Sequence, residues 1–328
     1  MPLSGMNTPR SSQRKIVLLS PRGFCAGVVR AIDVVRIALE TYGAPIYVRK
    51  EIVHNKHVVD ELRSAGAIFV DELTEVPTGA RVIFSAHGVA PSVRDEAKLR
   101  NLAVIDATCP LVTKVHLEAI RFARMGYSLV LIGHKDHDEV IGTMGEVPNS
   151  MVLVETVEDV ERLEFENPDK VAFLTQTTLS LDETRDIVQR LRERFPAISG
   201  PKSQDICYAT ENRQIAVKAV VPLCELLLVV GSQNSSNSRR LVETAEQRGV
   251  PGYLIDDVSE LRDEWLEGVE TLVLTAGASA PEHLVQDVLA HLRRAHNATV
   301  EEREVTREHL NFELPISLRV LAGSRDGA

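Results

Sequence analysis

FVDELTEV at residues 69–76, LVETVEDV at residues 153–160 and LIDDVSEL at residues 254–261 are three versions of one pattern. Each begins with two apolar residues and continues into a short acidic turn. They recur at intervals close to the size of a small domain, and such recurrence indicates a repeated structural unit. The chain is therefore predicted to contain three copies of one unit.

The sequence around these stretches alternates short β-branched or Leu-rich runs with amphipathic helical segments. This alternation is typical of α/β architecture with mostly parallel sheets. A helix is expected between Cys25 and a stop at Gly43, and Pro110 should begin another directly after Cys109. The predicted strands are 15–20, 81–86, 128–133, 170–175, 225–231 and 271–277.

Each predicted unit carries one cysteine that stands just before a helix. If the units pack around a pseudo-threefold axis as a trefoil, Cys25, Cys109 and Cys207 meet at the centre. A string of α/β units with unrelated cysteines is the alternative, because the repeat intervals are unequal. The predicted boundaries are a disordered extension over 1–14, repeats over 15–108, 109–206 and 207–295, and a C-terminal closing segment with a frayed tail over 296–328.

Two polar loops recur in each unit after predicted strands. Ligands of open α/β sheets bind at the carboxyl ends of the strands, so these loops are expected to surround the cysteines. The first loop reads VHNKH at 53–57, GHKDHDE at 133–139 and GSQNSSNS at 231–238; the second reads SAHG at 85–88, TQTT at 175–178 and GAS at 277–279.

The composition narrows the classes of partner. The chain has 328 residues, of which 44% are hydrophobic and 26% charged, and its formal net charge is −10. An acidic balance without a basic run argues against a broad nucleic-acid surface. No apolar stretch approaches the roughly 18 residues that span a bilayer, and the first residues lack the apolar core of a secretory signal. We expect a cytoplasmic protein with a small-molecule ligand and with no nucleic-acid or membrane partner.

The chemistry open to the cysteines depends on their surroundings. Cys224, in PLCELLLVVG, has the apolar context of a small buried hydrophobe. The other three stand in polar or turn-like segments at helix starts, where a thiolate is stabilised. Zinc is possible, although the local CxxC spacing of structural zinc sites is absent. An iron–sulfur cluster on three thiolates would leave one iron without a protein ligand, which gives a substrate oxygen a place to bind.

The polar loops offer many hydrogen-bond donors and few carboxylates, which suits a phosphate or diphosphate. Taken singly, each donor is more often a surface residue or a helix cap, but their equivalent places in three units favour one anion site. Glu139 is a carboxylate among these donors, so it is either an ordinary first-turn glutamate or a proton donor with a raised pKa. The candidate donors are His54, His87, His137, Ser235, Ser236, Asn237 and Ser279.

Ordered segments from Lys15 to about Leu318 resemble the 4-hydroxy-3-methylbut-2-enyl diphosphate reductase family. They include all three candidate cysteines. One departure is Asp138, where the family commonly has proline between the matching histidine and glutamate. The segments are PRGFCAGVVRAI, VHNKHVVDEL, IFSAHGV, DATCPLVTKVH, LIGHKDHDEVIGT, TQTTLS, DICYATENRQ, GSQNSSNSRRL and TAGASAPE.

The resemblance implies an α/β trefoil around a [4Fe–4S] cluster held by Cys25, Cys109 and Cys207. It implies reductive dehydroxylation of (E)-4-hydroxy-3-methylbut-2-enyl diphosphate to isopentenyl and dimethylallyl diphosphate, the last step of the methylerythritol phosphate route. Glu139 would donate a proton and Thr177 would lie near the substrate hydroxyl. The residues that would hold the diphosphate are His54, His87, His137, Ser235, Ser236, Asn237 and Ser279.

The same resemblance implies an external electron donor such as ferredoxin or flavodoxin. The chain contains no GxGxxG fingerprint or P-loop that would indicate a nicotinamide or nucleotide site. Two other functions compete with the reductase: a zinc-dependent phosphate-ester hydrolase, and an iron–sulfur redox sensor without turnover.

Overall fold

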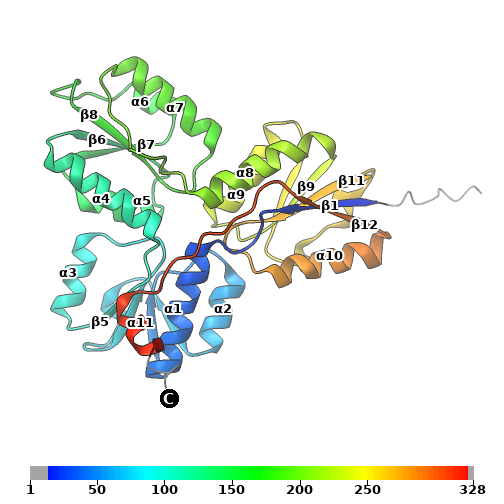
Figure 1. Cartoon of the computed structure of the whole chain (residues 1–328), viewed down its shortest axis with the longest axis horizontal. Helices are drawn as coiled ribbons and strands as arrows, with labels where there is room; N and C mark the ends of the chain where they lie inside the picture. Colours follow the sequence, from blue (N-terminus) through cyan, green and yellow to red (C-terminus); the bar gives the residue numbers. More distant parts are fainter. Residues whose placement is uncertain (1–13, 324–328) are drawn as a thin grey trace, which may run out of the picture.

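The computed structural model describes residues 14–323, so most of the predicted extension and the last five residues lie outside the described part. Arg14 was predicted to belong to that extension, but its Nε donates to Val269 O at 2.8 Å. Three α/β units meet at a common centre, each with its own sheet (Figure 1). This arrangement confirms the predicted trefoil of α/β units.

The first unit has a parallel sheet in the order β3-β2-β4-β5. Helices α1, α2 and α3 connect or flank its strands, and the edge strand β3 is followed by the short helix η1. The elements are α1 (Ala26–Tyr42), β2 (Ile46–Arg49), α2 (Lys56–Ser64), β3 (Ala67–Val70), η1 (Leu73–Glu75), β4 (Arg81–Phe84), α3 (Pro91–Leu99) and β5 (Ala103–Asp106).

The second unit has the smallest sheet, with the parallel order β7-β6-β8. All five residues of β8 are buried, as expected for a parallel strand covered on both faces. The elements are α4 (Pro110–Arg124), β6 (Ser128–Ile132), α5 (Asp138–Glu146), β7 (Met151–Val154), α6 (Val157–Val160), β8 (Val171–Thr175) and α7 (Leu181–Arg194).

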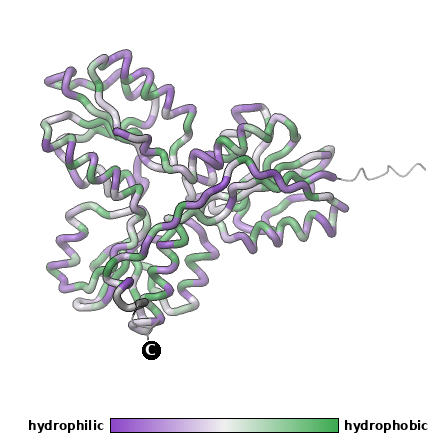
Figure 2. Tube along the Cα trace, viewed as in Figure 1, coloured by the Kyte–Doolittle hydropathy of each residue, from purple (hydrophilic) through white to green (hydrophobic). Residues whose placement is uncertain are grey.

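The third unit has the largest sheet, with the parallel order β10-β9-β11-β1-β12. Figure 2 shows the same pattern in all three units, with apolar strands inside, apart from the polar edge strand β12, and polar residues on the outer faces of the helices. The elements are β1 (Lys15–Ser20), α8 (Tyr208–Val220), η2 (Val221–Leu223), β9 (Leu226–Val230), α9 (Ser236–Glu246), β10 (Gly252–Ile255), η3 (Val258–Glu260), η4 (Asp263–Leu266), β11 (Thr271–Ala276), α10 (Glu282–His296) and β12 (Thr299–Glu304).

The three repeated stretches form the same local structure. Each supplies an edge strand, namely β3, β7 or β10, and then a single helical turn. The seventh residue of each stretch is Glu75, Asp159 or Glu260, and its carboxylate accepts backbone N–H groups at the start of the turn. The acidic pattern therefore persists because these carboxylates cap free N–H groups.

The first strand lies in a different sheet from the one that the predicted boundary at residue 15 implies. β1 pairs with β11 and β12, so it belongs to the third unit. The reason is a cyclic arrangement, in which the segment before each cysteine pairs with the preceding unit's sheet. β5 does so before Cys109, and Ser199 bridges to Ala172 of β8 before Cys207. β1 has this place before Cys25 and closes the circle.

The closing segment links the third unit to the first. After β12 the chain crosses the centre and ends in α11 (Ile316–Gly323), which packs against α1 (Figure 1). Leu314 and Leu318 join the apolar core of the first unit. Among residues 14–323, no helix combines the length and apolar character that a membrane crossing requires.

Candidate active site

The three candidate cysteines occupy equivalent places in the fold. Cys25, Cys109 and Cys207 are the N-cap residues of α1, α4 and α8, the first helix of each unit. Each backbone N–H donates to a carbonyl in the second polar loop of the preceding unit, over 2.9 to 3.1 Å. The cysteines are therefore held where two units meet.

The thiols lie close to one another. A methyl group added to Gly27 would be 2.9 Å from Cys109 Sγ and 3.8 Å from Cys25 Sγ, so both sulfurs lie against this glycine. Burial, with the nearby thiols adding to it, raises the pKa of Cys109 to about 12 and that of Cys207 to about 11. Thiolates here would repel one another, and a bound cationic centre would stabilise them.

One cavity brings all the predicted site residues together. It lies where the three units meet, and its walls come from loops at the carboxyl ends of strands and from the starts of α1, α4 and α8. The predicted residues on its walls are Cys25, His54, His87, Cys109, His137, Glu139, Thr177, Cys207, Ser235, Ser236, Asn237 and Ser279.

Three histidines form a cluster on one side of this cavity. The rings of His54 and His87 stack with centroids 4.0 Å apart, and the His137 ring lies 5.5 Å and 6.0 Å from them. Burial and the neighbouring histidines lower the pKa of His137 to about 3 and hold that of His87 well below its usual value. A bound anion would offset this repulsion and favour the charged rings.

His137 has one ring nitrogen ready to donate. Its Nδ1 accepts the backbone N–H of Glu139 at 3.2 Å, so the ring hydrogen is on Nε2. This Nε2 is buried and has no hydrogen-bond partner among the described residues. Buried donors are normally paired, so the geometry indicates a ligand acceptor at this place.

Two serine hydroxyls tie the loops of different units together. Ser236 Oγ donates to Thr178 O at 3.1 Å, and Ser279 Oγ donates to His54 O at 2.8 Å. A hydroxyl has one hydrogen, so each of these serines must rotate before it can donate to a ligand. These two bonds hold the loops of neighbouring units together.

Ser235 and Asn237 keep free donors. Ser235 Oγ accepts from Ser238 N at 3.3 Å and from Ser238 Oγ at 2.9 Å, so its own hydrogen is available. Asn237 Nδ2 donates one hydrogen to Thr210 Oγ1 at 3.1 Å and retains a second. These two side chains stand at the start of α9, where helical N–H groups also favour an anion.

Glu139 lies fully buried at the start of α5, opposite Thr177. Its Oε1 accepts Thr177 N at 2.6 Å, and its Oε2 lies 3.0 Å from Thr177 Oγ1. Burial raises the pKa of Glu139 to about 7, although the bonds from Thr177 lower it and the charge of Asp205 raises it. A carboxyl group with this pKa can hold and release a proton near neutral pH.

Asp138 does not displace its neighbours from the cavity. It is the first residue of α5, and His137 and Glu139 on either side of it both line the wall. One of its carboxylate oxygens and ring nitrogens of His54 and His87 all lie within 4.8 Å of one another. Asp138 therefore places a carboxylate beside the histidines.

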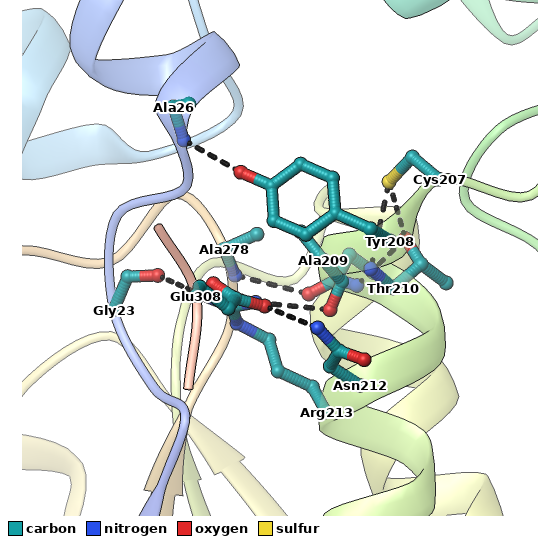
Figure 3. Close-up of polar contacts among 11 residues, drawn as sticks. Gly23, Ala26, Cys207, Tyr208, Ala209, Thr210, Asn212, Arg213, Ala278 and Glu308 are labelled. Atoms are coloured by element: carbon teal, nitrogen blue, oxygen red, sulfur yellow. Dashed lines mark hydrogen bonds and ion pairs between the residues drawn. The ribbon is translucent and has the colours of Figure 1, made fainter. Parts of the chain in front are cut away.

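The sequence reasoning missed Thr178, Tyr208 and Phe312, which also line the cavity. Tyr208 follows Cys207 directly, and its hydroxyl accepts Ala26 N at 3.0 Å (Figure 3). Phe312 comes from the closing segment, in which the sequence analysis predicts no site residue. An aromatic side chain between Asn311 and Glu313 is the feature of the sequence that could have pointed to it.

Other cysteine and histidine side chains lie outside the cavity. Cys224 packs against the core of the third unit. His57 Nε2 pairs with Asp257 at 3.0 Å, and His116 Nδ1 pairs with Glu146 at 2.9 Å. None of these side chains lines the cavity.

Comparison with known proteins identifies the family. The LytB protein family model matches residues 16–293. The 4-hydroxy-3-methylbut-2-enyl diphosphate reductases of Tolumonas auensis and Leifsonia xyli are 57% and 55% identical to the chain over 93% and 97% of its length, and over 100% and 95% of theirs. The solved E-1-hydroxy-2-methyl-but-2-enyl-4-diphosphate reductase from Plasmodium falciparum superposes with a TM-score of 0.93 at 41% identity, covering 96% of this chain and 99% of that one. The predicted resemblance is confirmed, and the chain belongs to the LytB protein family of 4-hydroxy-3-methylbut-2-enyl diphosphate reductases.

Proposed function

We propose that this chain is a [4Fe–4S] reductase that removes the hydroxyl of (E)-4-hydroxy-3-methylbut-2-enyl diphosphate and releases isopentenyl and dimethylallyl diphosphate. One observation carries the proposal: three cysteines, one per unit, meet in a cavity that also holds a buried carboxyl group and donors suited to a diphosphate. Relatives that share more than half of its residues carry this reductase name. The reaction is the last step of the methylerythritol phosphate route.

Cys25, Cys109 and Cys207 would hold the cluster. Their thiols face one cavity, and Gly27, which has no side chain, leaves room beside two of the sulfurs. When bound, a three-thiolate cluster supplies electrons and one iron that has no protein ligand. The remaining chemistry belongs to the protein side chains around it.

The diphosphate would lie between the histidine cluster and the start of α9. His137 Nε2, Ser235 Oγ and Asn237 Nδ2 each have a hydrogen to donate there. The serines among the remaining proposed contacts need a rotated hydroxyl, and the histidines need a ring N–H that faces the ligand, so binding and reorganisation would occur together. These contacts come from His54, His87, Ser236 and Ser279.

Glu139 would supply the proton that turns the leaving hydroxyl into water. Its Oε2 is within hydrogen-bond distance of Thr177 Oγ1, so a proton can pass from the carboxyl group through Thr177 to the substrate oxygen. Both side chains are almost fully buried, which keeps bulk water from competing for the proton. Delivery of the second proton to either end of the allylic system, after its reduction by two electrons, would give the two products.

The reaction exchanges a C–O bond for a C–H bond and releases water, so it consumes two electrons and two protons. We propose that a ferredoxin or flavodoxin supplies the electrons. Cys25, Cys109, Cys207 and Cys224 are all free, and free thiols persist in a reducing compartment. The cytoplasm is therefore the proposed location.

Anaerobic purification followed by iron, sulfide and zinc analysis tests the proposal. The expected result is about four irons and four sulfides per chain, with dithionite-driven conversion of the allylic alcohol diphosphate into both products. A colourless zinc protein that cleaves phosphate esters would support the hydrolase instead. A cluster without turnover of the diphosphate would support the redox sensor.

A further inference from the structure

A basic side chain follows each of the three cysteines by about one and a half helical turns. Arg30 lies five residues after Cys25, Lys114 five after Cys109, and Arg213 six after Cys207. They lie on α1, α4 and α8, the helices that the cysteines cap. None of them lines the cavity, so the proposed reaction leaves them without a role.

Arg30 reaches from the first unit to the segment before Cys109. Its Nη1 donates to Ala107 O at 3.0 Å and to Thr108 O at 3.1 Å. Its Nε donates to Glu313 O of the closing segment at 2.7 Å. The side chain is 9% exposed, so these carbonyls replace water as its partners.

Lys114 makes the equivalent connection from the second unit to the segment before Cys207. Its Nζ donates to Ser203 O at 2.8 Å and to Gln204 O at 3.1 Å, and it pairs with Asp205 Oδ1 at 3.0 Å. The other carboxylate oxygen, Oδ2, accepts a backbone N–H at the end of β8. Lys114 thus fixes the start of the third unit to the second.

Arg213 completes the circle from the third unit to the segment before Cys25 (Figure 3). Its Nη2 donates to Gly23 O at 2.7 Å, and its Nη1 donates to Ala209 O at 2.9 Å. The same Nη1 pairs with Glu308 of the closing segment at 3.0 Å. Only 1% of Arg213 is exposed, and such a buried guanidinium is retained only where its partners compensate for the lost water.

We propose that Arg30, Lys114 and Arg213, here called the cation ring, are positioning residues that set the spacing of the three thiols. Each fixes the irregular segment just before the next unit's cysteine, so the three bonds run in one direction around the centre. In these segments the carbonyls that they bind lie outside strands and helices, where the cations supply their partners. The assignment rests on the proposed function only in taking the three cysteines as ligands.

Arsenite binding by the metal-free reduced protein measures this spacing directly. Arsenous acid condenses with three thiols to form three As–S bonds and release three waters, with no change in oxidation state. Tight binding to one protein requires that the thiols already converge. We expect arsenite to bind the wild type with one equivalent per chain, and Cys224→Ser to bind equally well.

Arg30→Met, Lys114→Met and Arg213→Met should each weaken arsenite binding by about tenfold or more, because a charge-assisted bond to the cysteine segment is lost. Arg240→Met is the matched control. Arg240 is buried like Arg30 and Arg213, and it joins the third unit to the second through Glu183 at 3.0 Å, but it does not touch a cysteine segment. This control should lose thermal stability and keep wild-type arsenite affinity.

Conservative replacements separate positioning from folding. Lys114→Arg should recover most of the affinity, and Arg213→Lys should recover part, because a lysine cannot bridge Gly23 O and Ala209 O as a guanidinium does. Should Lys114→Met or Arg213→Met fail to fold, the conservative variant at that position still tests the ring. Unchanged arsenite affinity in all folded ring variants, or an equal loss in Arg240→Met, would overturn the proposal.

The arsenite result does not depend on turnover. If the ring variants bind arsenite weakly and the wild type does not convert the diphosphate, the proposed reductase activity is wrong and the role of the cation ring stands. If the ring variants convert the diphosphate normally and bind arsenite with wild-type affinity, the role of the cation ring is wrong and the proposed reductase activity stands.

Discussion

Helix α8 has a cysteine near each end, and the two thiols have different surroundings. At its N-terminus Cys207 caps the helix, donates its backbone N–H to Thr177 O of the second unit and lines the cavity. After the short continuation η2, Cys224 donates its thiol to Val221 O at 3.2 Å and packs within the third unit. Cys207 therefore lies at a helix start where two units meet, whereas Cys224 lies within one unit.

The largest expected effect is on the thiols themselves. Cys207→Ser removes a proposed ligand and should leave less than about a tenth of the wild-type iron, with no detectable turnover. Cys224→Ser should retain full iron and activity. Iron and sulfide analysis after anaerobic purification measures both. Loss of the cluster in the Cys224 variant would show that Cys224, and not only Cys207, is needed to hold it.

Helix α5 also has a glutamate at each end, and only the one at its start lines the cavity. Glu139→Gln, at the start of the helix, should lower kcat by about 1000-fold while the visible absorption of the cluster persists, because general acid catalysis contributes roughly 100- to 10,000-fold. The side chain of Glu146 at the other end is 5% exposed, and it pairs with Arg94 and His116 outside the cavity. Glu146→Gln should lower the Tm and keep kcat within about twofold. Comparable losses of kcat in both variants would contradict the assignment.

The pH dependence of kcat should follow Glu139. An acid must be protonated to donate, so kcat is expected to fall as pH rises through and above about 7, by about tenfold per unit. Thr177, Asp205 and Cys207 face this carboxyl group, and a bound diphosphate would raise its pKa further. Reduced methyl viologen, whose potential does not vary with pH, is the suitable donor. If the residual kcat of Glu139→Gln falls with rising pH in the same way, another group donates the proton.

The smallest expected effect compares two serine caps. Ser235 and Ser180 cap α9 and α7 and are equally buried, but only Ser235 lines the cavity. Ser235→Ala should raise KM by about tenfold, because the proposed hydrogen bond to the diphosphate is lost. Ser180→Ala should leave KM unchanged, while each variant loses about 1 kcal/mol of stability with its cap. Steady-state kinetics and thermal unfolding separate the two effects.

Local sequence patterns predicted a large part of the fold. The strand at 15–20 has the predicted bounds, and α1 ends where Gly43 takes a φ of 76°, which glycine tolerates. The repeated acidic stretches recur because a carboxylate caps the same turn in each unit. These features depend on residues close together in the chain, so the sequence alone reveals them.

Other features of the site could not be predicted because they depend on partners far apart in the chain. The residues KIVLLS do not indicate that β1 joins the sheet of the third unit. Phe312 reaches the cavity only because the closing segment crosses the centre. The hydroxyl hydrogens of Ser236 and Ser279 are already given to carbonyls, which no pattern of residue types could show.

The sequence by itself determined three α/β repeats, one cysteine at the start of a helix in each, and polar loops at strand ends. Period and residue type encode these features because helices, strands and caps form through short-range contacts. Only the tertiary structure decided that the thiols face one cavity, that burial raises the pKa of Glu139, and that Arg30, Lys114 and Arg213 link one unit to the next. Burial and charge pairing are properties of the packed units, so they exist only once the chain has folded.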